Sequence, residues 1–82
     1  MQIKPLNLRV QKQITRFGVR SKFEKQQKLF EINPFHPSLH TEKLEPKSVG
    51  LYSFRVDKKY RAIFRIHDGM AEIVHVTKHY EK

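Results

Sequence analysis

Residues 50–67, GLYSFRVDKKYRAIFRIH, constrain the fold most strongly, because they alternate like two neighbouring strands with unlike faces. Side chains in a strand point alternately to opposite sides of a sheet. If residues 57–59 form a three-residue turn, Arg55 lies directly opposite Arg61. The apolar face then carries Tyr52, Phe54, Val56, Tyr60, Ala62, Phe64 and Ile66, and the other face carries Ser53, Arg55, Arg61, Ile63 and Arg65. This pattern predicts a sheet with a core on one side and arginines on the other.

The facing arginines are unfavourable on their own, because two like charges directly opposite each other destabilise a bare sheet. A solvated arginine face and an anion-binding site both fit the pattern. In either case we expect the Arg61 side chain to point off the sheet. Its truncation should then leave no core cavity, and the domain should still fold.

The charge balance predicts a polyanionic partner. Seventeen Lys and Arg residues against eight Asp and Glu residues leave a net charge of +9. This excess favours nucleic acid over a membrane surface, because no segment pairs a basic face with a broad exposed apolar face. Charge alone fits an acidic protein equally well.

The length predicts a single domain over residues 1–82, and the absence of cysteine leaves packing to stabilise it. No apolar run approaches the ~18 residues of a membrane span, and the first residues lack the apolar stretch of a signal peptide. We therefore expect a cytoplasmic protein. We expect no cofactor and no metal site, and we interpret His36 and His40 as surface residues.

The N-terminal third predicts a strand followed by a helix. Residues 1–7 alternate weakly and contain a proline, which is typical of a short edge strand. Asn7 can cap a helix over residues 8–17, and Gly18 can end it. The apolar positions of this helix recur at helical spacing and are Leu6, Val10, Ile14 and Phe17.

A second helix is predicted over residues 22–32. Ser21 and Glu24 have the spacing of a capping box, and the helix should end before Asn33, which precedes a proline. The short connection implies an antiparallel helical hairpin. We expect the sheet and the first helix to cover the apolar residues of this helix, which are Phe23, Leu29, Phe30 and Ile32.

The remaining segments predict one long loop and a last strand. Residues 33–50 contain three prolines and form a shaped loop, with a short strand at residues 42–45. The last strand covers residues 71–77, with Val74 and Val76 facing the core. This orientation requires a three-residue turn at 68–70, since a two-residue turn would reverse the faces. Arg61 then lies opposite Thr77.

The residues near the end of the sheet have the chemistry needed to cleave RNA. Arg55, Arg61, His79 and Tyr80, with a carboxylate from the long loop, would share the open face. Cleavage of a phosphodiester needs a base for the 2′-hydroxyl, a cation for the charge that develops on phosphate, and an acid for the departing 5′-oxygen. Histidine can serve as acid or base near neutral pH, and arginine offers a fixed fork for phosphate.

The whole chain resembles the RelE/ParE superfamily of bacterial toxin–antitoxin toxins. The resemblance lies in a strand, two helices and a sheet with the sequences LYSFRV, KYRAIF and AEIVHVTKHY, preceded by an NPFHPSL loop. The closest pattern is that of the YoeB-like branch, ribosome-dependent mRNA endonucleases. The loop glutamate, strand arginine and final His-Tyr of this branch correspond to Glu42, Arg61, His79 and Tyr80.

The resemblance implies an α+β, RelE-like domain with an N-terminal strand and a helical hairpin packed on a twisted, mostly antiparallel sheet. It implies an mRNA interferase that works by metal-independent transesterification on the ribosome. His79 or Glu42 would be the base, and Arg61 would stabilise the phosphorane; the division of acid and base roles among Glu42, His79 and Tyr80 stays open. The expected phosphate-binding residues are Arg55, Arg65, Lys58, Lys59 and Lys78.

The resemblance also implies an antitoxin. A domain of charge +9 should bind an acidic, initially disordered antitoxin segment in a hetero-oligomer. The strand lysines of RelE itself have no counterpart here, because the matching strand contains Tyr52 to Arg55. Glu42 is chosen on spacing alone, and Glu45 is equally available. Two alternatives stay open: a ParE-like toxin that blocks DNA gyrase without cleaving RNA, and an inactive toxin-fold binding module.

Overall fold

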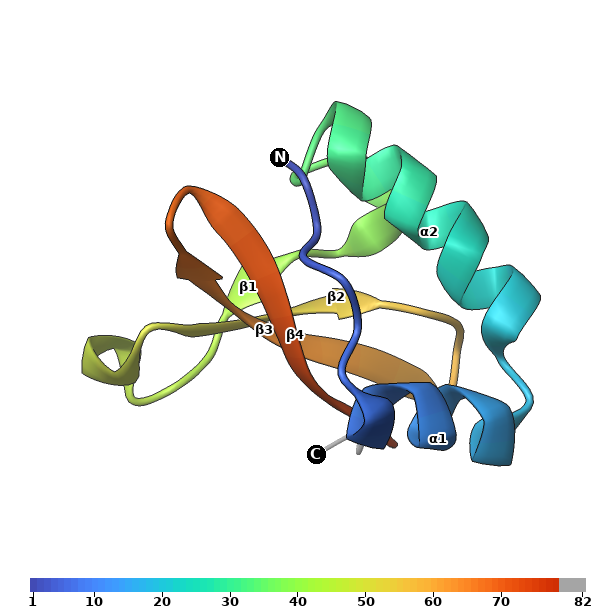
Figure 1. The fold of residues 1–82 in the computed structure, drawn as a ribbon. Helices are drawn as coiled ribbons and strands as arrows, with labels where there is room; N and C mark the ends of the chain where they lie inside the picture. Colours follow the sequence, from blue (N-terminus) through green and yellow to red (C-terminus); the bar gives the residue numbers. More distant parts are fainter. Residues whose placement is uncertain (79–82) are drawn as a thin grey trace.

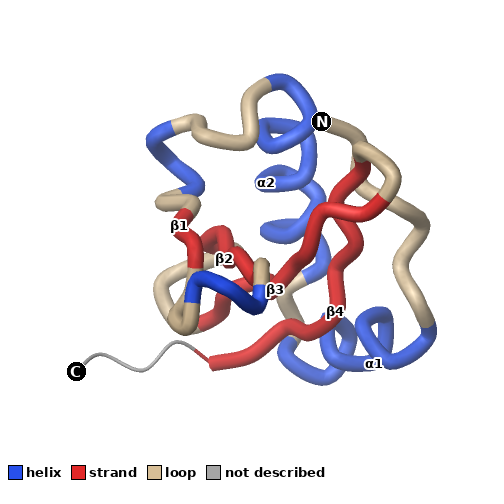
Figure 2. Tube along the Cα trace, turned by 90° about the vertical axis from the view of Figure 1, so that its left-hand side faces the viewer, coloured by secondary structure: helices blue, strands red, loops and turns tan. Residues whose placement is uncertain are grey.

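A four-stranded antiparallel sheet forms the centre of the molecule in a computed structural model that describes residues 1–78 (Figure 1). Figure 2 shows the strands following one another in the order β1-β2-β3-β4, with α1 below β4. The strands are β1 (Glu42–Lys43), β2 (Leu51–Arg55), β3 (Tyr60–His67) and β4 (Met70–Lys78). The predicted α+β architecture is confirmed. Neither helix in the described part of the chain has the length and apolar character to cross a bilayer.

The N-terminal segment and the first helix follow the prediction closely. Ile3 forms an isolated parallel bridge with Ala71 on the outer side of β4, which is a minimal version of the predicted edge strand. Helix α1 (Leu8–Phe17) begins after Asn7, whose side chain accepts a hydrogen bond of 2.8 Å from the Val10 N–H. Gly18 ends the helix with φ 66°, a left-handed conformation that glycine adopts without strain.

Helix α2 (Arg20–Ile32) begins two residues earlier than predicted, and the capping box was wrong. Val19 is the N-cap residue, and its side chain is buried. Its N–H bonds to the Ile14 carbonyl, and its own carbonyl accepts from the Phe23 N–H, so the chain turns directly from one helix into the next. Ser21 therefore lies inside the helix. Figure 1 shows α1 and α2 inclined to each other, a more open arrangement than the predicted antiparallel hairpin.

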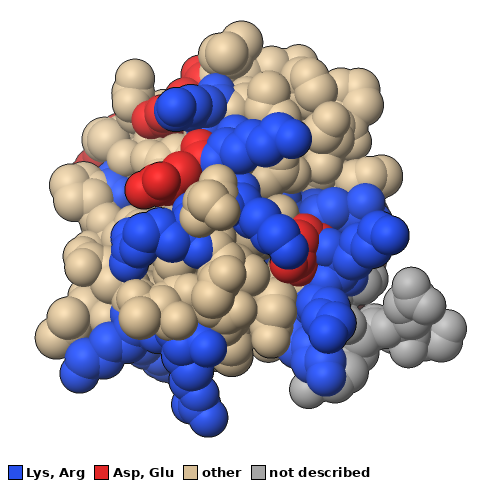
Figure 3. Space-filling model, turned by 90° about the vertical axis from the view of Figure 1, so that its right-hand side faces the viewer, with Lys and Arg blue, Asp and Glu red and all other residues tan. Residues whose placement is uncertain are grey.

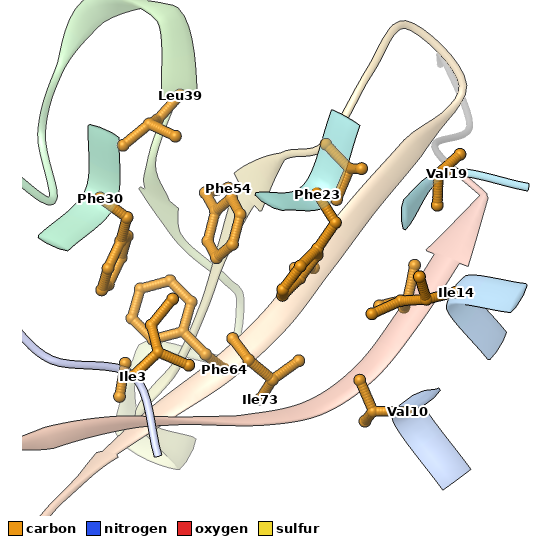
Figure 4. Packing of buried hydrophobic residues seen from close by; sticks show 14 residues of the cluster. Ile3, Val10, Ile14, Val19, Phe23, Phe30, Leu39, Phe54, Phe64 and Ile73 are labelled. Carbon is orange, nitrogen blue, oxygen red and sulfur yellow. The ribbon is translucent and has the colours of Figure 1, made fainter. Parts of the chain in front are cut away.

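The core lies between α1, α2 and one face of the sheet (Figure 4). Phe30 packs edge-on against Phe64 with ring centroids 5.1 Å apart, and Phe54 lies 5.2 Å from Phe30. Ile32, predicted to be covered, is 82% exposed because it belongs to the last turn of α2, and Ile66 is also exposed. The fully buried large side chains include Phe23, Phe30, Phe54, Ile14, Leu39, Val10 and Val76.

The turn between β3 and β4 corrects the sequence prediction. It contains two residues, Asp68 and Gly69, because His67 pairs directly with Met70. Both turn residues have positive φ, 54° and 72°, as a tight hairpin with a right-handed strand twist requires. The predicted three-residue turn was therefore wrong.

A β-bulge offsets the shorter turn. Ile63 pairs with His75 whereas Phe64 pairs with Ile73, so Val74 is an extra residue on β4. Ile73 is buried, and Val74 is only partly buried, which reverses their predicted roles. The extra residue in the bulge replaces the residue missing from the turn. Beyond the bulge, Arg61 therefore pairs with Thr77, as the three-residue turn had predicted.

Candidate active site

Arg61 lies at the centre of the candidate site, on the sheet face that points away from the core. It pairs in register with Arg55 on β2 and with Thr77 on β4, as predicted. Of the two alternatives left open by the sequence, a solvated arginine does not fit Arg61, because it is only 7% exposed. The loop between α2 and β1 reaches Arg61 through the His40 carbonyl.

Two polar partners hold the Arg61 guanidinium in place. Its Nε donates to Ser53 Oγ at 2.9 Å, and its Nη2 donates to the His40 carbonyl at 2.6 Å. His40 has φ 46°, and this left-handed conformation ends the short 3₁₀ helix Pro37–Leu39. The loop backbone is thus shaped so that a carbonyl contacts the arginine. Fixing the fork in this way leaves it little freedom to reorient.

The second amino group of Arg61 has no partner among residues 1–78. Its Nη1 makes no hydrogen bond to any residue of the described chain. No buried side-chain nitrogen or oxygen among residues 1–78 lacks a partner, so Nη1 is not a buried unpaired donor within this part of the chain. This N–H pair can donate to an anionic oxygen without breaking the bonds that fix the side chain.

A carboxylate and a second guanidinium, those of Glu42 and Arg55, lie near Arg61 and shift its pKa in opposite directions. Glu42 on β1 places Oε1 3.9 Å from Arg61 Nη2, and 59% of its side chain is exposed. Burial lowers the pKa of Arg61 from its usual value, Glu42 raises it and the neighbouring Arg55 lowers it. The guanidinium stays charged, because an arginine pKa is far above neutral. The site is therefore a fixed cation beside a second cation and an accessible carboxylate.

The turn between β2 and β3 presents Lys58 and Lys59, both exposed, at the same end of the sheet. Asp57 shapes this turn, since its Oδ1 accepts from the Lys59 and Tyr60 N–H groups at 2.8 Å each. Burial raises the pKa of Asp57, but these bonds and the ion pair with Lys22 outweigh it, so the net shift is downward.

The other predicted residues are distributed unevenly. Arg65 lies towards the opposite end of β3, where its Nε bonds to Glu72; this bond lowers the Glu72 pKa. Lys78 is exposed and pairs in register with Tyr60, one position from Arg61. His79 and Tyr80 follow Lys78 in the sequence and lie outside the described residues. The structure thus brings Glu42, Arg55, Arg61, Lys58, Lys59 and Lys78 to one end of the sheet and separates Arg65 from them.

Solved structures of toxins match this fold over nearly the whole chain. A YoeB/ParE toxin from Agrobacterium tumefaciens superposes with a TM-score of 0.74, at 17% sequence identity over 98% of this chain and 100% of that one. Two structures of the YoeB-YefM complex from Staphylococcus aureus, one described as a heterotetrameric toxin-antitoxin complex, give 0.71 at 20% identity over 98% of both chains. Neither protein-family models nor curated protein sequences match the chain. The chain has the YoeB/ParE toxin fold.

Within this YoeB/ParE fold, three supporting features escaped the sequence prediction. Ser53 was assigned to the arginine face but not to the site, although alternation already placed it beside Arg55. The His40 carbonyl was missed because sequence does not specify the path of an irregular loop. Gln26, a buried polar residue of α2, donates to the Ser38 carbonyl at 3.1 Å and the Arg55 carbonyl at 2.8 Å. It ties the loop and the end of β2 to the helix.

The arrangement can bind and stabilise an anion. Arg61 Nη1 and the facing Arg55 can both approach one phosphate, and the Glu42 carboxylate lies close enough to exchange a proton nearby. Among residues 1–78, no group of three or more His, Cys, Asp or Glu side chains is arranged to hold a metal ion.

Proposed function

We propose that this protein is the toxin of a toxin–antitoxin module and cleaves mRNA on the ribosome. One observation carries the proposal: in a YoeB/ParE toxin fold, Arg61 is buried and fixed by Ser53 and His40, and near Arg55 and Glu42 its Nη1 makes no hydrogen bond within residues 1–78. A buried charge is costly unless its hydrogen-bonding groups are satisfied. A developing phosphorane would give Nη1 an anionic partner while the bonds to Ser53 and His40 stay in place.

The proposed reaction is transesterification within the RNA. The 2′-oxygen of one nucleotide attacks the adjacent phosphorus, and the bond from phosphorus to the 5′-oxygen of the next nucleotide breaks. The products are a 2′,3′-cyclic phosphate and a 5′-hydroxyl. Glu42 or His79 accepts the 2′-hydroxyl proton, and His79 or Tyr80 returns a proton to the leaving oxygen.

The arginines supply the electrostatic part of the mechanism. Arg61 stabilises the negative charge on the phosphorane from a fixed position, so it needs no reorganisation as the charge builds up. Arg55 positions the phosphate, while Lys58, Lys59 and Lys78 attract the flanking RNA at the same end of the sheet. Arg65, at the far end, would contact RNA beyond the cleaved nucleotide.

An antitoxin partner is part of the proposal. The S. aureus neighbours come from structures of YoeB-YefM complexes, one described as toxin-antitoxin, and the match covers 98% of each neighbour chain. The net charge of +9 favours an acidic partner that covers the arginine face and assembles with the toxin in the cytoplasm. A short acidic protein encoded in the same operon would support this part of the proposal, and its absence would weaken it.

The decisive experiment uses ribosomes carrying an mRNA with a single 2′-deoxy substitution. The parent protein should cleave the all-ribose message and leave a 2′,3′-cyclic phosphate, identified by mass spectrometry of the fragment. The substituted message should resist cleavage at that position, because it lacks the attacking oxygen. Cleavage at the deoxy position would rule out this chemistry. If induced cells keep their mRNA intact but stop replicating DNA, the protein is a gyrase-directed toxin and not a nuclease.

A further inference from the structure

The outward surface of α1 is the most one-sided charged region of the molecule. The first 23 residues contain six Lys or Arg residues and no Asp or Glu. Within and just after α1, Arg9, Lys12, Arg16 and Arg20 are all exposed, and none of them forms an ion pair within residues 1–78. Figure 3 shows Lys and Arg side chains without acidic ones over the lowest part of the molecule, where α1 lies in Figure 1.

Arg9 and Lys12 do not serve the fold, although Arg16 lies in the last turn of α1, where the helix dipole favours a cation, and Arg20 Nη2 donates to Thr15 Oγ1 at 3.2 Å. Arg9 lies in the first turn of α1, where the helix dipole favours acidic residues, and that turn contains none. Arg9 and Lys12 are three residues apart, and Lys12 and Arg16 are four apart, so each pair repels along one face of the helix. A local pattern that opposes stability is expected where a surface has another use.

The helix holds these charges on a rigid base. Val10 and Ile14 are fully buried on its inner side. Gln13 accepts from the Val76 N–H at 2.8 Å through Oε1, and its Nε2 lies 3.0 Å from His75 Nδ1. Together with the Asn7 cap and the Gly18 stop, these contacts attach α1 to the edge strand β4. The cations therefore project from a fixed backbone.

The shape of this surface is a ridge between two shallow hollows. Lys12 and Arg16 line both hollows, with Leu8 at one end. One hollow, of about 460 Å³, also contains Arg9 and Gln13; the other, of about 360 Å³, contains Gln11, Thr15 and Arg20. From Arg9 to Arg16 the helix rises roughly 10 Å, so successive cations stand about 5 Å apart along it.

We propose that this α1 surface, formed by Arg9, Lys12, Arg16 and Arg20, binds the phosphate backbone of structured RNA outside the cleaved segment. A ladder of cations matches a regular array of phosphates, and Gln11 and Thr15 add polar contacts to sugars. A protein partner would need apolar anchors at its centre, but only Leu8 offers one here, 66% exposed. The choice of RNA as the ligand rests on the proposed function, whereas the surface itself is separate from the candidate active site.

The test uses a labelled RNA duplex with 2′-O-methyl sugars, which cannot undergo the proposed cleavage and needs no ribosome. Anisotropy titrations from 50 to 300 mM salt compare the parent with the triple variant Arg9→Gln, Lys12→Gln, Arg16→Gln. The matched control is Lys25→Gln, Lys28→Gln, Lys47→Gln, which removes the same charge from exposed lysines elsewhere. The α1 variant should bind at least tenfold more weakly at about 100 mM salt, and its log–log salt slope should fall by about 2, because roughly 0.7 to 0.9 is lost per phosphate contact.

Each other outcome overturns the proposal. Equal weakening in the α1 and control variants would assign the effect to net charge. Parent-like binding by the α1 variant would show that the α1 surface does not bind RNA. If a polyglutamate peptide binds the parent more tightly than the duplex and loses more affinity in the α1 variant, the surface serves an acidic protein. Since the probe cannot be cleaved, these results do not depend on whether the parent cleaves mRNA on ribosomes.

Discussion

Arg61 and the cations of α1 present their charges in opposite ways. Arg61 is 7% exposed and its guanidinium is fixed by Ser53 and the His40 carbonyl. Lys12 and Arg16 are exposed and form no ion pair with the described residues. A fixed cation suits charge that develops at one point in a reaction, whereas exposed cations spaced along a helix suit a charge spread along a polymer. The two regions should therefore respond differently when a charge is removed.

The largest effect is expected for Arg61→Ala. It should slow cleavage by ~10², and it should also lower the free energy of unfolding by about 3 kcal/mol, because Ser53 and the His40 carbonyl lose a charged partner in a covered region. This differs from the sequence expectation, in which folding was unaffected. Urea unfolding monitored by circular dichroism measures the stability change. Parent-like stability would mean that the buried bonds contribute nothing.

Ser53→Ala tests the support of the guanidinium without removing its charge. Loss of the 2.9 Å bond from Arg61 Nε should cost about 1 to 2 kcal/mol of unfolding free energy and reduce cleavage about tenfold, since the fork becomes free to tilt. Equilibrium unfolding and single-turnover cleavage are measured on the same preparation. A stability loss with an unchanged cleavage rate would separate Ser53 from the site.

Asp57 gives a pH dependence to the turn that carries Lys58 and Lys59. Its folded-state pKa is lowered below the usual 3.8, so its contribution to stability is present above that value and is lost as pH falls through the folded-state pKa. Asp57→Ala should cost about 1 kcal/mol at pH 7 by removing the two turn hydrogen bonds. It should also flatten the fall in thermal stability below pH 4. An equally steep acid fall in Asp57→Ala and the parent would assign that fall to other groups.

The smallest stability effect is expected for Lys12→Gln on α1. Removing one charge from a like-charged row should leave the unfolding free energy unchanged or raise it by about 0.2 to 0.5 kcal/mol. Thermal melting at low salt detects this change, and the gain should vanish at high salt because screening already removes the repulsion. A clear destabilisation would show that Lys12 supports the fold, which would make α1 resemble the Arg61 region.

Regular elements could be predicted because their residues repeat with the period of the structure. Helix α1 matched its predicted bounds, and the register of Arg61 with Arg55 and Thr77 was correct. The Thr77 pairing was reached through two compensating differences, a shorter turn and a bulge. The alternating pattern determines which residues of two strands can pair on the same face. It does not show whether an extra residue between them lies in the turn or in a bulge of the strand.

The burial of Arg61 could not be predicted, because it depends on a loop without periodicity. The segment between α2 and β1 contains prolines that restrict its path locally, yet its position beside Arg61 is set by contacts such as those of Gln26 with the Ser38 and Arg55 carbonyls. Such contacts join residues far apart in the sequence. The strand register of Arg61 was predictable from sequence, whereas its enclosure was not.

The most direct test of the account is the single-turnover cleavage of ribosome-bound mRNA by Arg61→Lys. Lysine keeps the charge and most of the volume, so this variant should fold, but it lacks the planar fork that bonds Ser53 and His40 while leaving Nη1 free. We predict cleavage at least tenfold slower than the parent at saturating ribosomes, with Lys28→Gln at the parental rate. A folded Arg61→Lys variant that cleaves at the parental rate would contradict the account.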